Sequence, residues 1–145
     1  MTHICSGKFF TKQLAYAAGY TSPKRFTTDV LRYDLPIHPC GPESYRDNLY
    51  DLPNLLKSII LGRLKEVGLP MAKSRPILDL INDHDANQAA FLFLISKKKC
   101  LFCVVNYGGK PQASWQTSNL PELFEASAGL ILDVGQELLR MRAAG

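Results

Sequence analysis

The sequence of 145 residues predicts an α+β protein, with helices in residues 1–82 and a β-β-β-α arrangement in residues 83–145. Two observations lead to this prediction. Through most of the first part, apolar residues recur at helical spacing, and glycine or proline interrupts them at turns. In the second part, short apolar runs rich in β-branched and aromatic residues are separated by turn-forming residues and precede a long helical pattern. We therefore expect two domains that meet near residue 82.

The overall composition is that of an ordinary globular protein, with 46% apolar and 21% charged residues. No apolar run approaches the roughly 18 to 20 residues that cross a bilayer. The first ten residues lack the apolar segment of a secretory signal. These features predict a cytoplasmic protein without a membrane partner, in which the four cysteines would be thiols.

The net charge of +4 is concentrated in the first part of the chain. Residues 1–81 contain 11 Lys and Arg against 7 Asp and Glu, whereas the remaining residues contain 6 of each sign. If the protein binds a polyanion, we expect the first part to bind it.

The first expected helix covers Thr11 to Gly19. Leu14, Ala15 and Ala18 would share its apolar face, and Gly19 suits a left-handed helix end.

A second helix is expected to follow directly and to end before Pro36. Ser22 can cap it and Pro23 can occupy its first position, where proline is tolerated. Phe26 and Val30 would point inward. The side chains expected to face solvent are basic or hydroxyl-bearing, namely Lys24, Arg25, Thr27, Thr28 and Arg32. Two short helices of this kind are typical of a helix-turn-helix.

From Pro36 to Tyr50, prolines and a glycine leave room only for a short hairpin ending near "SYR". The next stretch, "DLPNLLKSIILGRLKEVG", predicts a long helix that Gly68 ends. The stretch "PMAKSRPILDLI" can start another helix, which Pro76 would make short, late or kinked.

In the second part, "NDHDANQ" is interpreted as a polar hinge, and "AAFLFLIS", "CLFCVVNY" and "PQASWQTS" as three strands. A closing helix is expected over residues 119–143. Its apolar stripe could cover the sheet, pack against a second copy of the chain, or do both. The stripe consists of Leu123, Leu130, Val134, Leu138 and Met141.

The sequence predicts no metal site and no cofactor. Cys100 and Cys103 are three positions apart on an expected strand, so their side chains would point to opposite faces. His84 lies between two aspartates, but neighbouring residues rarely converge on one ion, and we favour a capped loop. Trp115 and the aromatic residues Phe91, Phe93 and Phe102 could line an effector pocket, although we favour core packing.

Catalytic motifs are also missing from the sequence. It contains no nucleophile elbow, phosphate loop or dinucleotide fingerprint, so we expect a protein that is not an enzyme.

The order of these elements resembles the MerR family of bacterial transcription regulators over residues 8–81. "TKQLAYAAG" is similar to the first helix of that family, "YRDNLY" to its wing, and "YDLPNLLKSIILGRLKEVGLPMAKSRPIL" to its last two DNA-domain helices. The chain departs from the family in the recognition segment "KRFTTDVLRYDLPIHP" and in two extra residues between Arg46 and Tyr50.

The resemblance implies a winged helix-turn-helix that binds double-stranded DNA as a homodimer, with RNA polymerase or a small effector as possible further partners. Bases and phosphates would be contacted from the second helix, from Lys12 and Gln13 at the start of the first, and from Tyr45 and Arg46 in the wing. The alternative is a phage or plasmid accessory protein that uses the same scaffold to hold another protein, without DNA.

Overall fold

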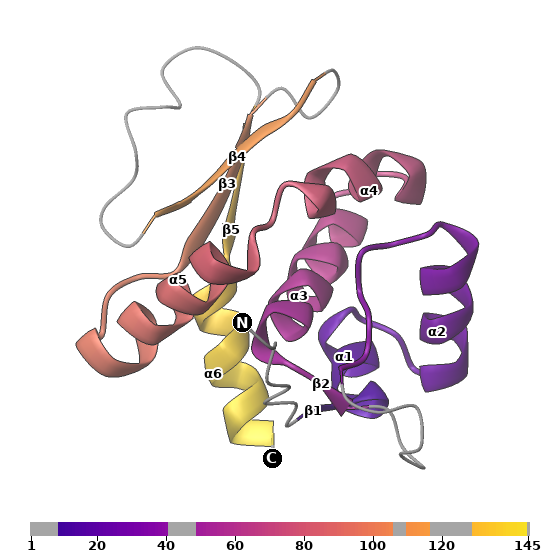
Figure 1. Ribbon diagram of the computed structural model, residues 1–145, viewed down its shortest axis with the longest axis horizontal. Coiled ribbons are helices and arrows are strands. Elements are labelled where there is room, and N and C mark those ends of the chain that lie inside the picture. Colours follow the sequence, from indigo (N-terminus) through magenta and orange to yellow (C-terminus); the bar gives the residue numbers. More distant parts are fainter. Residues whose placement is uncertain (1–8, 41–48, 106–109, 117–128, 145) are drawn as a thin grey trace.

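The computed structural model describes residues 9–40, 49–105, 110–116 and 129–144 (Figure 1). They form an α+β fold with six helices, a three-stranded antiparallel sheet and a two-stranded ladder, which confirms the predicted class. No helix in these ranges is long and apolar enough to cross a membrane. The elements are β1 (Phe9–Phe10), α1 (Thr11–Ala17), α2 (Pro23–Arg32), β2 (Leu49–Tyr50), α3 (Leu52–Glu66), α4 (Met71–Asp79), α5 (Asp83–Ser96), β3 (Leu101–Val105), β4 (Gln112–Gln116), β5 (Gly129–Asp133) and α6 (Val134–Ala144).

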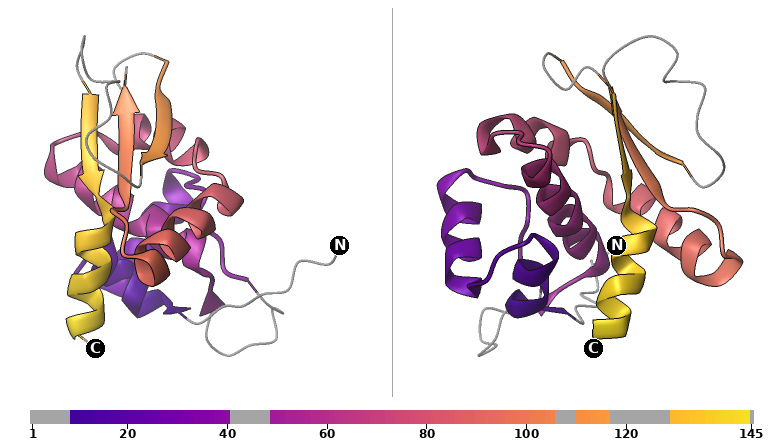
Figure 2. Two further views of the ribbon diagram at one scale, coloured as in Figure 1. Left: turned by 90° about the vertical axis from the view of Figure 1, so that its left-hand side faces the viewer. Right: turned by 180° about the vertical axis from the view of Figure 1, so that it is seen from behind.

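Helix α3 lies in the middle of the molecule and contacts α1, α4, α5 and α6. The helices α1, α2 and α4 lie on one side of it, and α5, α6 and the sheet lie on the other (Figures 1 and 2). One cluster of buried apolar side chains extends through both sides, from Leu14 in α1 to Val134 in α6.

The two expected N-terminal helices are present. The hydroxyl of Ser22 accepts a hydrogen bond from the backbone N–H of Arg25 at 3.3 Å, and Pro23 is the first residue of α2. Between the helices, Gly19 has φ +80°, the left-handed conformation that glycine adopts without strain. The side chain of Phe26 is 1% exposed and anchors α2 in the core.

The long and short helices expected after Tyr50 are also confirmed. Asp51 caps α3 by accepting a hydrogen bond from the backbone N–H of Asn54, and Gly68, with φ +83°, follows the end of this helix. Pro76 lies inside α4, and the helix nevertheless continues to Asp79.

The prediction of the first of the three strands is wrong. "AAFLFLIS" forms the second half of α5, and the presumed polar hinge is the beginning of that helix. The carbonyl oxygen of the Asn82 side chain accepts hydrogen bonds from the backbone N–H groups of His84 and Asp85. Ala86, Ala89 and Ala90 then repeat at helical spacing and are buried, so small side chains allow α5 to pack closely.

The closing helix begins later than expected, at Val134. Gly129–Asp133 is instead strand β5, which pairs antiparallel with β3, so the sheet has the order β4-β3-β5. The largely buried β3 requires hydrogen-bond partners on both edges, and β5 supplies the second. Asp133 then caps α6 by accepting a hydrogen bond from the backbone N–H of Gln136 at 3.1 Å.

The apolar stripe, which we expected to cover the sheet, to meet a second copy or to do both, packs against the chain's own core where the structure describes it. Val134 is fully buried, and Leu130, Leu138 and Met141 pack against the core, while Leu123 lies outside the described residues. An ion pair between Arg63 and Glu137 holds α6 against α3. Of the two uses considered for this stripe, the structure shows burial against the molecule's own core.

In the region of the expected wing, β1 pairs antiparallel with β2, and Cys40 forms a further bridge to Leu49. Tyr45 and Arg46, the predicted wing contacts, lie outside the described residues.

Candidate nucleic-acid interface

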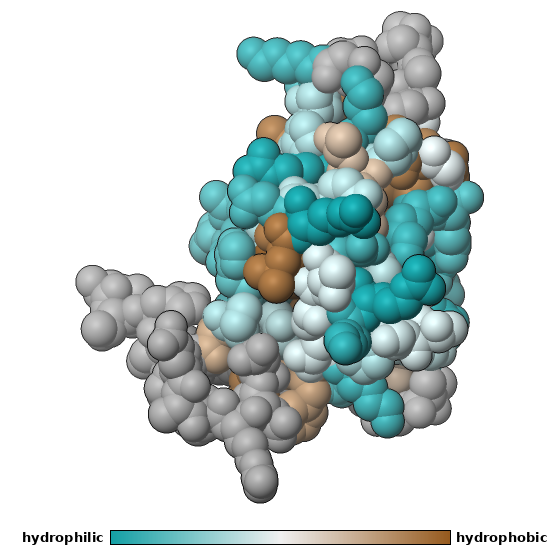
Figure 3. All heavy atoms as spheres, turned by 90° about the vertical axis from the view of Figure 1, so that its right-hand side faces the viewer, coloured by the Kyte–Doolittle hydropathy of each residue, from teal (hydrophilic) through white to brown (hydrophobic). Residues whose placement is uncertain are grey.

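The outer face of α2 carries the predicted basic and hydroxyl side chains. Lys24, Arg25 and Arg32 are exposed, and Thr27 and Thr28 lie beside them on the same helix. This side of the molecule is largely covered by hydrophilic side chains, with a small hydrophobic patch among them (Figure 3). The helix therefore presents three cations to solvent while Phe26 anchors its opposite face.

The inner flank of α2 is fixed by a cluster around Tyr20. Its ring packs edge-on against Phe26 at 5.5 Å between centroids, and its hydroxyl donates a hydrogen bond to Asp29 at 2.5 Å. The ammonium of Lys65 in α3 lies 3.6 Å from the centre of the same ring. Burial, and then the hydrogen bond to Asp29, raise the pKa of Tyr20. The carboxylate of Asp29 is thus hydrogen-bonded within the chain, on the inner flank of the helix.

The other carboxylate near α2 is paired with a cation. Asp34, just after the helix, forms an ion pair with Arg75 of α4 at 3.2 Å, and Arg75 also donates to the Asp34 carbonyl oxygen at 2.9 Å. The carboxylate of Asp34 is therefore paired with a cation, whereas Asp29 accepts from a neutral hydroxyl and keeps its negative charge on the inner flank of α2.

The hydroxyls of Thr27 and Thr28 both donate to the carbonyl oxygen of Lys24, at 3.0 and 2.8 Å. A hydroxyl whose proton is used in this way retains lone pairs that can accept. These threonines are therefore suited to accept from a base amino group or to place a methyl against thymine. Arginine and lysine side chains have the chemistry to contact phosphates or guanine.

Leu31 was missed by the sequence reasoning. It is 82% exposed, more than any other large apolar side chain among the described residues. Its position could have been found from helical spacing, because Leu31 follows Thr28 by three residues and Lys24 by seven and so shares their face. A largely apolar hollow of about 260 Å³ adjoins it, lined by α2, by residues 34–39 and by Tyr50.

Lys12 and Gln13 lie in the first turn of α1. Lys12 is exposed, whereas the side-chain oxygen of Gln13 accepts a hydrogen bond from the backbone N–H of Phe10 at 2.8 Å. Gln13 thus satisfies the helix N-terminus, a structural use that the sequence reasoning did not foresee.

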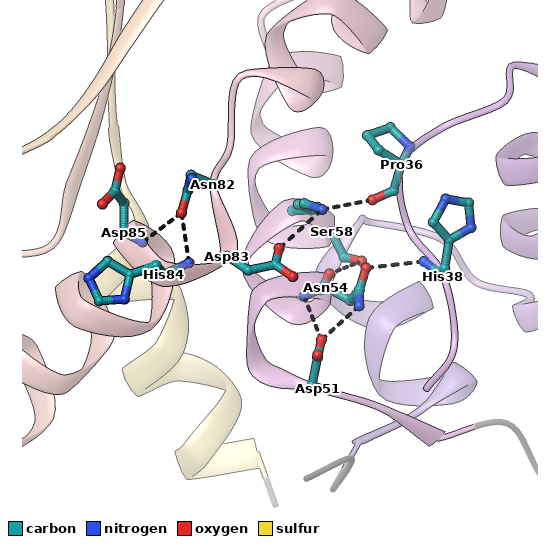
Figure 4. Close-up of polar contacts among 10 residues, drawn as sticks. Pro36, His38, Asp51, Asn54, Ser58, Asn82, Asp83, His84 and Asp85 are labelled. Carbon is teal, nitrogen blue, oxygen red and sulfur yellow. Dashed lines mark hydrogen bonds and ion pairs between the residues drawn. The ribbon is translucent and has the colours of Figure 1, made fainter. Parts of the chain in front are cut away.

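Behind α2, the buried Lys57 connects three segments of the chain. Its ammonium donates to the carbonyl oxygen of Pro36 at 3.0 Å and lies 3.6 Å from the carboxylate of Asp83 at the start of α5. One turn earlier in α3, the side chain of Asn54 accepts from the backbone N–H of His38 at 3.1 Å (Figure 4). These bonds fix the segment after α2 against α3 and α5.

The cysteines show no arrangement that suggests a metal site in the described part of the chain. Burial raises the pKa of Cys100 to about 12 and also raises the pKa of Cys103, so both remain thiols at neutral pH. Cys40, which we expected to be a thiol, is disulfide-bonded. Within the described ranges, no three His, Cys, Asp or Glu side chains gather where they could hold a metal ion.

Comparison with known proteins gives no family assignment, since no family model matches the sequence and no curated protein matches it.

Proposed function

We propose that the protein binds duplex DNA through the outer face of α2 and regulates transcription in the manner of MerR-like regulators. The observation that supports this most is the composition of that face. Three cations, two threonines and Leu31 are presented by a helix that Phe26 anchors from behind. Asp34 is paired with Arg75, and Asp29 accepts from Tyr20 on the inner flank of the helix. Such a surface supplies phosphate contacts and base contacts from one helix.

The test compares two double variants that lose the same charge. Arg25→Ala with Arg32→Ala removes cations from α2, and Lys97→Ala with Lys98→Ala removes them just after α5, on the opposite side of the molecule (Figure 2). Fluorescence anisotropy with a labelled mixed-sequence duplex should show salt-dependent binding by the wild type and by the lysine variant. The arginine variant should bind more weakly, and the slope of log K against log salt should be less steep by about 0.9 for each phosphate that is no longer neutralised.

Equal binding by the two double variants would show that α2 is not the interface. Both variants change exposed residues, so circular dichroism and thermal unfolding should be unaltered, and a weaker binding cannot then be assigned to unfolding.

A homodimer is part of the proposal, since two copies of α2 would bind a palindromic site. Because Val134 is buried and Leu130, Leu138 and Met141 pack against the chain's own core, we place the dimer contact on another surface. Phe91, Leu94 and Ile95 form an exposed apolar ridge on α5, at helical spacing, and we place the second copy there. Light scattering at high micromolar concentration should give twice the monomer mass, and Ile95→Glu should return it to one; a monomeric wild type would exclude the two-fold site.

The alternative function, a module that holds another protein, is favoured by one observation. The apolar hollow beside Leu31 could receive an apolar side chain of a partner, which DNA would not supply beyond a thymine methyl. If the wild type shows no salt-dependent duplex binding at low salt, this alternative replaces the first.

A further inference from the structure

A second concave site lies on the far side of α3 from α2. A cavity of about 390 Å³ opens between α5 and the edge of the sheet formed by β4. Its volume is within the range of small-molecule sites, roughly 300 to 1,000 Å³. Leu80 and Leu92 contribute apolar surface, and Asp85 and Gln88 bring polar groups from the first two turns of α5.

One wall of the cavity is aromatic. Trp115 of β4 packs on Phe102 of β3 with 4.9 Å between ring centres and 59° between the planes. Phe102 is buried, whereas Trp115 is partly exposed and lines the cavity. An indole held in this way offers a flat apolar surface and the strongest cation–π face among the side chains.

Among the described residues that line the cavity, the one charged side chain is that of Asp85. Figure 4 shows the side chains of Asn82 and Asp85 pointing to the same side of the start of α5, while Asp83 points away from them. Lys57 pairs with Asp83, but no ion pair forms at Asp85 within the described residues. Of the described residues that line the cavity, none is basic.

We propose that this cavity binds a small planar aromatic cation, whose ring lies against Trp115 and whose amidinium or ammonium group faces the carboxylate of Asp85. The indole of Trp115 favours a planar ring, and the carboxylate of Asp85 favours a positively charged group. The site does not depend on DNA binding, so either proposal can fail without the other.

Trp115 is the single tryptophan of the chain and therefore reports on this site alone. Titration of the full chain with benzamidine, followed by tryptophan emission, should give a saturable change. Benzamide and benzoate, a neutral and an anionic molecule of nearly the same shape, should bind at least about fivefold more weakly, since neither can form the charge-assisted hydrogen bond.

Asp85→Asn should weaken benzamidine binding by about three- to tenfold and leave the weak binding of benzamide unchanged. The matched control is Asp83→Asn, which removes the same charge two residues away and should bind benzamidine as the wild type does. Equal affinities for the three molecules, equal effects of the two substitutions, or no saturable change in emission would each overturn the proposal. Thermal unfolding of both variants shows whether a weaker affinity comes from the binding site or from a destabilised fold.

Discussion

Helices α2 and α3 are consecutive helices of the chain, but they differ in how many of their residues are buried. In α2, Phe26 is the one residue that is fully buried, and the outer side consists of charged and hydroxyl groups. In α3, nearly every residue from Pro53 to Leu64 is buried, including Asn54, Lys57 and Ser58. Every buried side-chain nitrogen or oxygen in the described part of the chain has a hydrogen-bond partner.

The difference separates polar residues that can bind a partner from those that stabilise the fold. The buried polar groups of α3 form hydrogen bonds or ion pairs with carbonyl oxygens, N–H groups and carboxylates of the same chain. Loss of such a partner would cost about 1–3 kcal/mol for each group left unpaired. The cations of α2 are exposed to solvent and, within the described ranges, form no such bonds with buried groups. Substitutions in α3 should therefore change stability, and substitutions on the outer face of α2 should change binding.

The largest effect within α3 is expected from Gly62→Ala. A Cβ atom at this position would lie 2.7 Å from the carbonyl oxygen of Ala17 and 3.0 Å from the backbone carbon of Ala18, so the two helices would have to separate. We expect a loss of about 3 kcal/mol from overpacking, even though alanine favours a helix over glycine by about 1 kcal/mol. Urea unfolding measures it.

Gly135→Ala in α6 is the matched control. The new Cβ would also have its nearest atom at 2.7 Å, but that atom belongs to the ring of Phe93, which can move. The loss should be clearly smaller, about 1 kcal/mol. Equal losses at the two glycines would show that backbone contact between α1 and α3 is not what limits the first site.

An intermediate effect is expected at Lys57, which is 9% exposed. Lys57→Met keeps the apolar stem but leaves the Pro36 carbonyl oxygen without this donor, at a cost of about 1–2 kcal/mol. Lys57→Ala also removes the packing of the stem and should cost about 2–3 kcal/mol. Asp83→Asn should cost less than about 0.5 kcal/mol, because the partner carboxylate is 57% exposed. Urea unfolding of the three variants measures these costs, and wild-type stability of Lys57→Met would refute the structural role of the ammonium.

The first part of the fold could be predicted because local signals were strong and agreed with the tertiary structure. Ser22 with Pro23, and Gly68 after a helical repeat, define helix ends by backbone geometry that does not depend on distant residues. The exposed residues of α2 followed from the same repeat. The partners of Asp29 and Asp34 could not be predicted, since Tyr20 and Arg75 reach them through the packing of other elements.

The second part was partly misread because a short apolar run has no clear period. "AAFLFLIS" is apolar on all sides, so it fits a buried strand as well as a helix that rests on alanines and exposes Phe91 and Ile95. The caps at Asn82 and Asp133 were the available signals for the two helix starts. The pairing of β5 with β3 joins segments far apart in sequence, which no local pattern shows.

The smallest effect on stability, and the sharpest test of the comparison, is expected at Leu31. Because its side chain is 82% exposed, Leu31→Ala should change the free energy of unfolding by less than about 0.5 kcal/mol. Phe26→Ala, on the buried face of the same helix, should cost about 3–5 kcal/mol.

If α2 enters a DNA groove, Leu31→Ala should weaken binding to a mixed-sequence duplex several-fold while the slope of log K against log salt stays unchanged, since an apolar contact releases no counterions. The arginine double variant should change that slope. If Leu31→Ala leaves duplex binding intact while the arginine variant abolishes it, only the charged edge of α2 meets DNA, and Leu31 with its adjoining hollow belongs to a contact with another protein.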